Sequence, residues 1–257
     1  LPPVEPGDVF HYLLQDQNSH QKLTQCMRFD GTSLIQLSQS VCKKDIDTMH
    51  TYLQGNDDIH FYDYEGLCNE ERKKFICEKI DQFLYRLCDE LKKCKNPEEF
   101  FVALQRYRLL APFRNGTLGC NNINEYALKM FRKLLPQKFR SYMPILVTKN
   151  DFELGVTNGE VGLLYMNDEN RKEVLFEDLK SSESFRSIPL SLLSEFEPAY
   201  CLSVHKSQGS EFENVFLLFP EESESFGARM LYTAITRAKK KIEILSSMTT
   251  LKNTVLA

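Results

Sequence analysis

The stretch CLSVHKSQGSEFENVFLLFP, residues 201–220, decides how this chain is expected to fold. The apolar run Leu202–Val204 leads into a polar turn at 205–209, and a second apolar run follows at 215–219. Two strand-like runs joined by a polar turn that contains Gly209 have the outline of a phosphate-binding unit. The pattern G-x-x-x-x-G-K-S/T, which holds nucleotide phosphates in P-loop proteins, is nowhere in the sequence. The chain therefore has part of a nucleotide site and lacks the loop that grips the phosphates.

An alternation of strands and helices extends outward from this stretch. Strands are predicted at 199–204 and 214–219, a helix at 226–238, and a last strand at KIEILSS, residues 241–247. Further predicted elements are a helix over Leu34, Ile35 and Leu37, a helix at 70–95, a helix at 97–106 that begins at Asn96–Pro97, a strand at 107–113 and a helix at 121–135. Strands that alternate with helices indicate an α/β fold with a mostly parallel sheet.

The middle of the chain has a different character. Short strand-like runs separated by turn residues are found at 144–148, 161–166, 173–177 and 185–190. Asn158-Gly159 predicts a turn between the first two of these strands. Such a pattern is typical of a small β-barrel, and about 50 residues favour an insertion supported by a host domain. In contrast, residues 54–69 are rich in Asp, Asn and Gly and are predicted to form a loop or a short hairpin.

Bulk composition limits the possible classes of protein. The 257 residues suit one large or two smaller domains, and 42% hydrophobic with 26% charged residues is typical of a globular protein. No stretch has the apolar length needed to cross a bilayer, so no membrane partner and a cytoplasmic location are expected. The net charge of −4 gives no overall basic character, so nucleic-acid binding would depend on a local basic face. The opening Leu-Pro-Pro-Val, without an initiator methionine, suggests a fragment or a processed piece.

The cysteines are predicted to be reduced and mostly buried. No C-x-x-C pair occurs, and the five histidines supply no ligand pair at the spacing of zinc sites. A metal site or a disulfide framework is therefore not expected. The eight cysteines are Cys26, Cys42, Cys68, Cys77, Cys88, Cys94, Cys120 and Cys201.

Several segments resemble the motifs of superfamily 1 helicases, in the family's order. AYCLSVHKSQGSEFENVFLLFP (199–220) resembles motif V, and LYTAITRAKKKIEIL (231–245) resembles motif VI. LTQCMRFD (23–30) is similar to motif IV, although Met27 stands where an aromatic residue is usual. The opening LPPV is similar to the end of motif III. This resemblance implies the second RecA-like domain of a P-loop NTPase-type helicase, whose first domain carries the P-loop.

Two further segments resemble the RecD branch, the α subunit of exodeoxyribonuclease V. LLAPFRNGTLGCNNIN (109–124) matches a family stretch of the form L/P-x-R-x-G-x-x-G, and PILVTKNDFELGVTNGEVG (144–162) is similar to the segment that opens an SH3-like insertion. The resemblance covers nearly the whole chain and is weakest at 45–108. The implied domains are the end of the first RecA-like domain at 1–27, the second RecA-like domain at 28–143 and 197–257, and an inserted SH3-like barrel at 144–196.

The resemblance implies nucleotide-contacting residues. Arg237 and Arg28 correspond to the arginines that contact the γ-phosphate, a role that suits the planar fork of a guanidinium. Glu211 corresponds to the motif V acid that bonds the ribose, and Gly209 would let the backbone approach the nucleotide. The alternatives are an exposed arginine at a basic helix end, a surface arginine before a turn, and an exposed glutamate.

The resemblance also implies contacts with a single DNA strand. His205, Lys206 and Ser207 correspond to the motif V turn that lies along the strand, where polar side chains position a nucleic-acid backbone. The residues Thr148, Lys149 and Asn150 form a second expected contact segment. Arg114 either contacts DNA or braces the turn before Gly116.

The predicted function is that of an ATP-dependent helicase that moves 5′ to 3′ along single-stranded DNA. Its cofactors would be ATP and Mg²⁺, held mainly by the first domain, so this chain alone is not expected to hydrolyse ATP. The partners implied are the β and γ subunits of exodeoxyribonuclease V. Alternatives are a RecD-like helicase outside that complex, an RNA-directed relative, or a non-catalytic module that binds nucleic acid or protein.

Overall fold

The computed structural model describes residues 32–178 and 184–257. Two compact units divide the chain: the first unit runs up to Gly66 and resumes at Gln208–Ala257, and the second unit is Leu67–Ser207. Both combine helices with strands, so the predicted α/β class is confirmed. The predicted end of a preceding domain at 1–27, and Arg28, lie outside the described residues.

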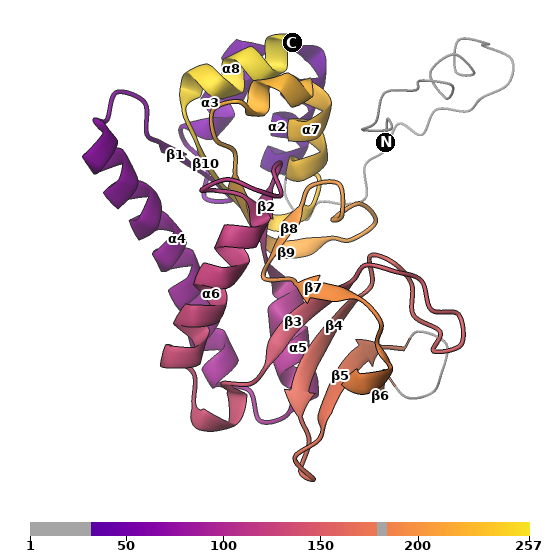
Figure 1. Ribbon diagram of the computed structural model, residues 1–257. Coiled ribbons are helices and arrows are strands. Elements are labelled where there is room, and N and C mark those ends of the chain that lie inside the picture. Colours follow the sequence, from indigo (N-terminus) through magenta and orange to yellow (C-terminus); the bar gives the residue numbers. More distant parts are fainter. Residues whose placement is uncertain (1–31, 179–183) are drawn as a thin grey trace, which may run out of the picture. The chain divides into compact units, whose positions relative to one another are not determined.

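The first unit contains parallel strands whose apolar residues are buried. Strand β10 (Ala238–Ser246) pairs in parallel with both β1 (Ile59–Asp63) and β9 (Phe212–Leu218). The run from Val215 to Leu218 is buried throughout, as expected for a parallel strand covered on both faces. Its helices are α2 (Thr32–Lys43), α3 (Ile46–Leu53), α7 (Gly227–Ile235) and α8 (Met248–Leu256), with the 3₁₀ turn η3 at Ser223–Phe226. Figure 1 shows these helices gathered together, with α2 against α3 and α7, and α7 against α8.

Strand β1 corrects the sequence prediction for residues 54–69. Instead of a loop or a local hairpin, Ile59–Asp63 forms a strand in register with β10, from Ile59 opposite Ile242 to Asp63 opposite Ser246. The strand is short, only Ile59 in it is buried, and its flanks are rich in turn residues. Its pairing partner is far away in the sequence, so local pattern could not reveal it.

The second unit contains a parallel pair of strands with helices around it. Strand β2 (Tyr107–Ala111) pairs with β8 (Cys201–Ser203), with Leu109 opposite Cys201. The helices are α4 (Asn69–Lys92), α5 (Pro97–Arg106) and α6 (Cys120–Leu134), and the 3₁₀ turn η1 is Gln137–Phe139. The predicted bounds of α5 are confirmed, because the Asn96 side chain accepts a hydrogen bond from the Glu99 amide (2.8 Å) and proline occupies the first turn.

The middle of the second unit is an antiparallel sheet in the order β6-β5-β4-β3-β7. Its strands are β3 (Met143–Val147), β4 (Val161–Met166), β5 (Lys172–Glu177), β6 (Phe185–Pro189) and β7 (Phe196–Pro198), with the 3₁₀ turn η2 (Leu190–Leu192) before β7. Ile145, Val147, Val174 and Phe176 belong to its buried core. Gly159 has φ +91° in the connection between β3 and β4, which confirms the turn predicted there. Helix α5 packs against this sheet (Figure 1), and the rings of Phe101 and Phe185 meet edge-on at 6.1 Å.

Asn124 of α6 fastens two strands of the second unit. Its buried side-chain amide accepts a hydrogen bond from the Cys201 amide (2.8 Å) and donates to the carbonyls of Cys201 (3.0 Å) and Pro198 (2.9 Å). One side chain therefore joins α6 to the start of β8 and to the end of β7. These bonds satisfy backbone groups that would otherwise be costly to bury.

Asn124→Ala is expected to lower the free energy of unfolding by about 2–4 kcal/mol, because it removes three hydrogen bonds and leaves buried backbone groups without this partner. Urea unfolding followed by circular dichroism measures the loss. The matched control is Asn121→Ala in the same helix, whose exposed side chain donates to the Asn115 side chain, and it should change stability by about 0.5 kcal/mol or less. Equal losses in the two variants would contradict the role given to Asn124.

Gly162→Ala in β4 is expected to destabilise the antiparallel sheet by about 1–3 kcal/mol. An added Cβ would lie 2.6 Å from Val174 Cγ1 and 2.7 Å from Phe176 Cε1, inside the core of the sheet. Gly55→Ala is the control, because an added Cβ there meets nothing within 4 Å. An unchanged thermal midpoint for Gly162→Ala would show that the core has room for the methyl group.

Candidate functional site

Arg237 lies just after the end of α7 in the first unit, and its guanidinium is buried. The residue is 1% exposed. Its Nε donates to the Thr233 carbonyl (3.1 Å), Nη1 to the Ser210 carbonyl (2.9 Å) and Nη2 to Thr236 Oγ1 (3.2 Å). The alternative of an exposed arginine at a basic helix end is therefore wrong. The guanidinium instead joins the last turn of α7 to the loop before β9.

The structure brings Arg237 together with the other residues predicted to contact nucleotide in this unit. The Phe212 amide donates to the Arg237 carbonyl (2.8 Å), so Glu211 directly precedes a residue bonded to Arg237. The Glu211 carboxylate lies 3.3 Å from Lys239 Nζ. Gly209 has φ +86°, and an added Cβ there would meet nothing within 4 Å, so backbone conformation and not crowding requires glycine. Arg28 lies outside the described residues.

The polar turn after β8 is held by its own hydrogen bonds. The Ser207 amide donates to the Ser203 carbonyl (3.0 Å), and the Ser207 hydroxyl donates to the Val204 carbonyl (2.7 Å). Ser207 is fully buried, whereas the side chains of His205 and Lys206 are partly exposed. Of the three residues predicted to contact DNA here, His205 and Lys206 face solvent, and Ser207 supports the turn.

Glu197 of β7 forms ion pairs with two cations of the second unit. Its Oε1 lies 2.7 Å from Lys206 Nζ, and its Oε2 lies 2.6 Å from Arg114 Nη2. One carboxylate thus joins two cations from segments far apart in the sequence. Sequence reasoning missed Glu197, because nothing in its local pattern points to these distant partners.

The Arg114 guanidinium contacts Glu197 of β7, a residue far from Arg114 in the sequence. The turn that follows Arg114 depends on glycine. Gly116 has φ +98°, and an added Cβ at Gly119 would lie 2.4 Å from the Asn115 carbonyl oxygen. The R-x-G-x-x-G spacing therefore places an arginine on a loop whose path the two glycines make possible.

The segment Thr148–Asn150 follows β3 and adjoins the same region. The Thr148 amide donates to the Glu195 carbonyl (3.2 Å), and Asn150 Oδ1 accepts from the Asn158 amide (2.7 Å). Strand β3 pairs with β7, with Leu146 opposite Glu197. Because Lys206 contacts Glu197 and Thr148 contacts Glu195, both predicted DNA-contact segments of the second unit meet around β7.

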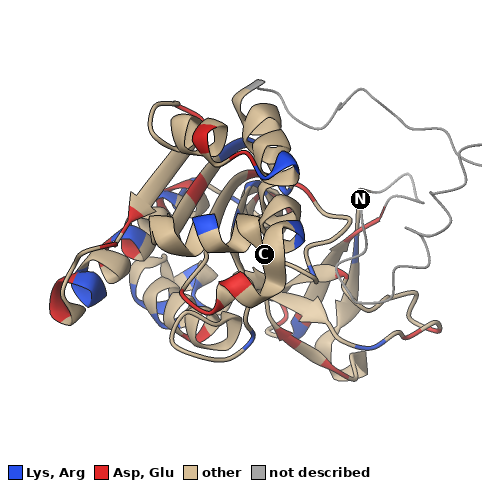
Figure 2. Cartoon of the chain, turned by 90° about the horizontal axis from the view of Figure 1, so that it is seen from above, with Lys and Arg blue, Asp and Glu red and all other residues tan. Residues whose placement is uncertain are grey.

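The distribution of charge is mixed. Figure 2 shows Lys and Arg residues interspersed with Asp and Glu residues along the helices and strands. Within residues 32–178 and 184–257, no group of three or more His, Cys, Asp or Glu side chains could hold a metal ion. The same described residues include no helix that is long and apolar enough to cross a membrane. Because positive and negative residues are mixed over the chain, a nucleic-acid interface would involve a local group of basic residues.

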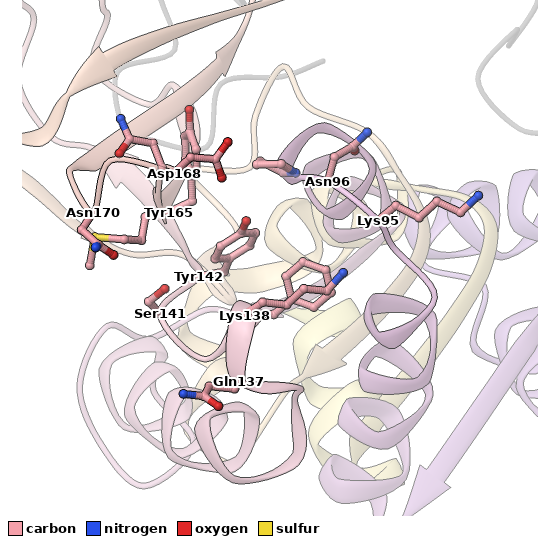
Figure 3. A pocket seen from close by; sticks show the side chains of 13 residues that line it. Lys95, Asn96, Gln137, Lys138, Ser141, Tyr142, Tyr165, Asp168 and Asn170 are labelled. Atoms are coloured by element: carbon pink, nitrogen blue, oxygen red, sulfur yellow. The ribbon is translucent and has the colours of Figure 1, made fainter.

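The second unit also has a cavity of about 720 Å³ that sequence reasoning did not anticipate. Figure 3 shows the Tyr142 ring at its centre, with Tyr165 and Asp168 on one side and Lys138 on the other. Burial raises the pKa of Tyr142 and of Tyr165, so both are protonated phenols at neutral pH. The cavity is lined by Lys95, Asn96, Pro97, Gln137, Lys138, Phe139, Ser141, Tyr142, Tyr165, Met166, Asn167, Asp168 and Asn170, and none of these is a predicted site residue.

The cysteines of the described part are free thiols, and they divide between core and surface. Cys88, Cys94, Cys120 and Cys201 are buried, as predicted, whereas Cys42, Cys68 and Cys77 are exposed. The neighbouring Cys201 thiol lowers the pKa of Cys120, and burial raises the pKa of Cys201. Their place between α6 and β8 makes this pair part of the packing.

Comparison with known proteins agrees with the motifs. Residues 198–245 match the family described as the UvrD-like helicase C-terminal domain. This match contains the motif V turn, Glu211 and Arg237. The match thus covers the polar turn of the second unit and the Arg237 cluster of the first.

Curated relatives extend the similarity over most of the chain. The RecBCD enzyme subunit RecD of Buchnera aphidicola subsp. Schizaphis graminum is 27% identical, with 100% of this chain and 45% of the relative covered. The same subunit from Buchnera aphidicola subsp. Acyrthosiphon pisum is 30% identical, with 89% and 39% covered. The chain therefore spans less than half the length of these relatives.

Solved structures resemble the chain only distantly. A Pif1 helicase from Bacteroides in complex with ADP-AlF3 and ssDNA aligns with 14% identity and a TM-score of 0.42, covering 91% of this chain and 53% of that one. A TM-score this low carries no argument about the site. The family is shown instead by the ordered motifs, the matched helicase domain and the similarity to RecD subunits. The chain corresponds to the C-terminal part of a RecD-type superfamily 1 helicase.

Proposed function

We propose that this chain supplies the second RecA-like domain of an ATP-dependent 5′-to-3′ DNA helicase. The observation that carries the proposal is the meeting of Arg237 with Ser210, next to Gly209 and Glu211, in one corner of the first unit. Phosphoryl transfer needs positive charge aimed at the oxygens on which negative charge develops. In this proposal Arg237 supplies that charge, and Glu211 bonds the ribose.

The hydrogen-bond partners of Arg237 are compatible with this role. Thr233, Ser210 and Thr236 offer uncharged oxygens to the guanidinium. Charged phosphate oxygens are stronger acceptors than carbonyls or hydroxyls, so exchange of one such bond for a phosphate contact is favourable. ATP and Mg²⁺ would be held mainly by the P-loop and acidic residues of the other RecA-like domain. Arg28 is proposed as a second contact with the γ-phosphate.

The proposed mechanism couples closure of the two RecA-like domains to movement along a single strand. ATP would draw the domains together around the arginines, and hydrolysis would release them. In the second unit His205, Lys206 and the segment Thr148–Asn150 would hold the strand during this cycle. Ser207 is retained in the proposal as a residue of the same motif, with its buried hydroxyl supporting the turn.

We propose that the antiparallel sheet is an SH3-like insertion that closes over the single strand. Support comes from its meander of four strands, its 3₁₀ turn before β7, and the return of β7 to pair with β3. The proposed domains are 1–27 as the end of the first RecA-like domain, 28–143 and 197–257 as the second, and 144–196 as the insertion.

We further propose that the protein is the α subunit of a cytoplasmic exodeoxyribonuclease V of the RecBCD type, active in DNA repair and recombination. Curated relatives named RecBCD enzyme subunit RecD cover 87–100% of this chain at 27–30% identity. A helicase outside that complex is the second candidate, since the ATP-dependent RecD2 DNA helicase of Deinococcus radiodurans matches 52% of the chain at 26% identity. Co-purification of the full-length protein with the β and γ subunits distinguishes the two.

The 257-residue chain by itself is expected to hydrolyse ATP no faster than a buffer blank, because its sequence has no P-loop lysine or phosphate cradle. A phosphate-release assay on the purified chain, with and without oligo-dT, checks this. Robust hydrolysis would contradict the division of the nucleotide site between two domains.

Arg237→Lys in the full-length helicase is expected to lower kcat for ATP about a thousandfold while nucleotide affinity changes only a few-fold. Lysine keeps the charge and loses the planar fork that reaches several oxygens at once. Steady-state ATPase kinetics and fluorescent-nucleotide binding provide the two readouts. Arg229→Ala, at an exposed arginine of α7, is the control and should retain activity. Parallel loss of nucleotide binding and kcat would instead assign Arg237 a purely structural role.

A further inference from the structure

Glu197 lies between two cations that come from distant segments of the second unit, Arg114 and Lys206. We propose that Arg114 and Lys206 together bind one backbone phosphate of single-stranded DNA, and that the Glu197 carboxylate occupies this phosphate site until DNA displaces it. The inference rests on the proposed helicase function and adds to it a binding residue, Arg114, and a resident competitor, Glu197.

The geometry of the contacts supports this assignment. Each carboxylate oxygen of Glu197 contacts a different cation, Oε1 with Lys206 Nζ at 2.7 Å and Oε2 with Arg114 Nη2 at 2.6 Å. A phosphodiester likewise presents two equivalent, negatively charged oxygens, and it accepts hydrogen bonds from the same donors. The two cations are therefore already spaced to hold one anion of this kind.

The three side chains are exposed enough for the exchange. The exposed fractions of the side chains are 63% for Arg114, 31% for Lys206 and 24% for Glu197. Ion pairs in contact with water contribute little net stability, so a phosphate can replace the carboxylate without the cost of breaking a buried pair. Glu197 would then swing toward solvent.

The backbone positions of Arg114, Glu197 and Lys206 are fixed, although their side chains are at least partly exposed. Arg114 is carried by the loop that Gly116 and Gly119 make possible. Glu197 is held in β7 by its pairing with β3, and Lys206 by the hydrogen bonds of the turn after β8. Fixed backbones with flexible charged tips give a site that exists before the ligand arrives.

Nucleic acid fits this surface better than an acidic peptide. Lys206 and His205 belong to the same polar turn, and the segment Thr148–Asn150 contacts Glu195, the residue directly before β7. Arg114 and Lys206 together bind one anion. The neighbouring polar segments can contact further anions, and a DNA strand supplies these as a regular series of phosphates.

The test measures binding of the full-length helicase to fluorescently labelled oligo-dT by anisotropy over a series of salt concentrations. Arg114→Gln and Lys206→Gln should each weaken binding several-fold at low salt and reduce the slope of log K against log salt by about 0.7. Glu197→Gln should strengthen binding between about two- and tenfold, because it removes the competing charge. In the Arg114→Gln background, the gain from Glu197→Gln should shrink.

Matched controls come from α6, where Lys129 and Glu125 form an exposed ion pair at 2.6 Å. Lys129→Gln and Glu125→Gln change the net charge by the same amounts and should leave the affinity and the slope unchanged. Thermal midpoints of all variants should agree with that of the parent protein. If Glu125→Gln raised the affinity as much as Glu197→Gln, the change in net charge alone would explain the gain, and the proposed phosphate site would be rejected.

Other outcomes overturn the proposal while leaving the helicase function intact. Normal binding of oligo-dT by the parent, with no change in affinity or slope in Arg114→Gln or Glu197→Gln, would exclude the phosphate site. Stronger binding of a poly-glutamate peptide than of oligo-dT, lost in Arg114→Gln, would assign the cations to a peptide. Failure of the parent protein to bind oligo-dT, or to hydrolyse ATP in its presence, would instead reject the proposed helicase function itself.

Discussion

The surface of the second unit depends on the Asn124 amide. By bonding both the start of β8 and the end of β7, this one buried side chain fixes the two backbones that carry Lys206 and Glu197. A charged site needs such uncharged support, because exposed ion pairs are too weak to position the segments that bear them. The buried hydrogen bonds of Asn124 thus fix the positions of the backbones that carry Lys206 and Glu197. Exposure to water then weakens the ion pairs that these side chains form.

Arg237 illustrates how structure and chemistry share one residue in the first unit. Its guanidinium joins the end of α7 to the Ser210 carbonyl, while its own carbonyl accepts from Phe212 at the start of β9. If a phosphate oxygen takes over one of these donors, the loop before β9 loses a bond to α7. The proposed binding of nucleotide would thereby be linked to the conformation of the motif V loop through the contacts of Arg237 alone.

Sequence reasoning succeeded where the signal was local. The bounds of α5 follow from the Asn96 cap and Pro97, and the ordered motifs identified the helicase branch. It failed where pairing was distant: β1 finds its partner β10 across most of the chain, and nothing around Glu197 indicates Arg114 or Lys206. Side-chain burial was also beyond it, since the sequence left open an exposed arginine at a basic helix end, yet the structure buries Arg237. Such burial depends on acceptors such as Ser210, which lie in another segment.

The pairing of β3 with β7 has a consequence for how this architecture can vary. The chain enters the antiparallel sheet through β3 and leaves it through β7, and Ile145 stands opposite Pro198. The strand through which the chain enters the sheet and the strand through which it leaves are therefore neighbours. The sheet thus has the connections of an inserted domain, whose two ends lie close together. Residues between these two strands can be lengthened, shortened or exchanged for another module during evolution, as domain insertions are, without redirecting the chain on either side.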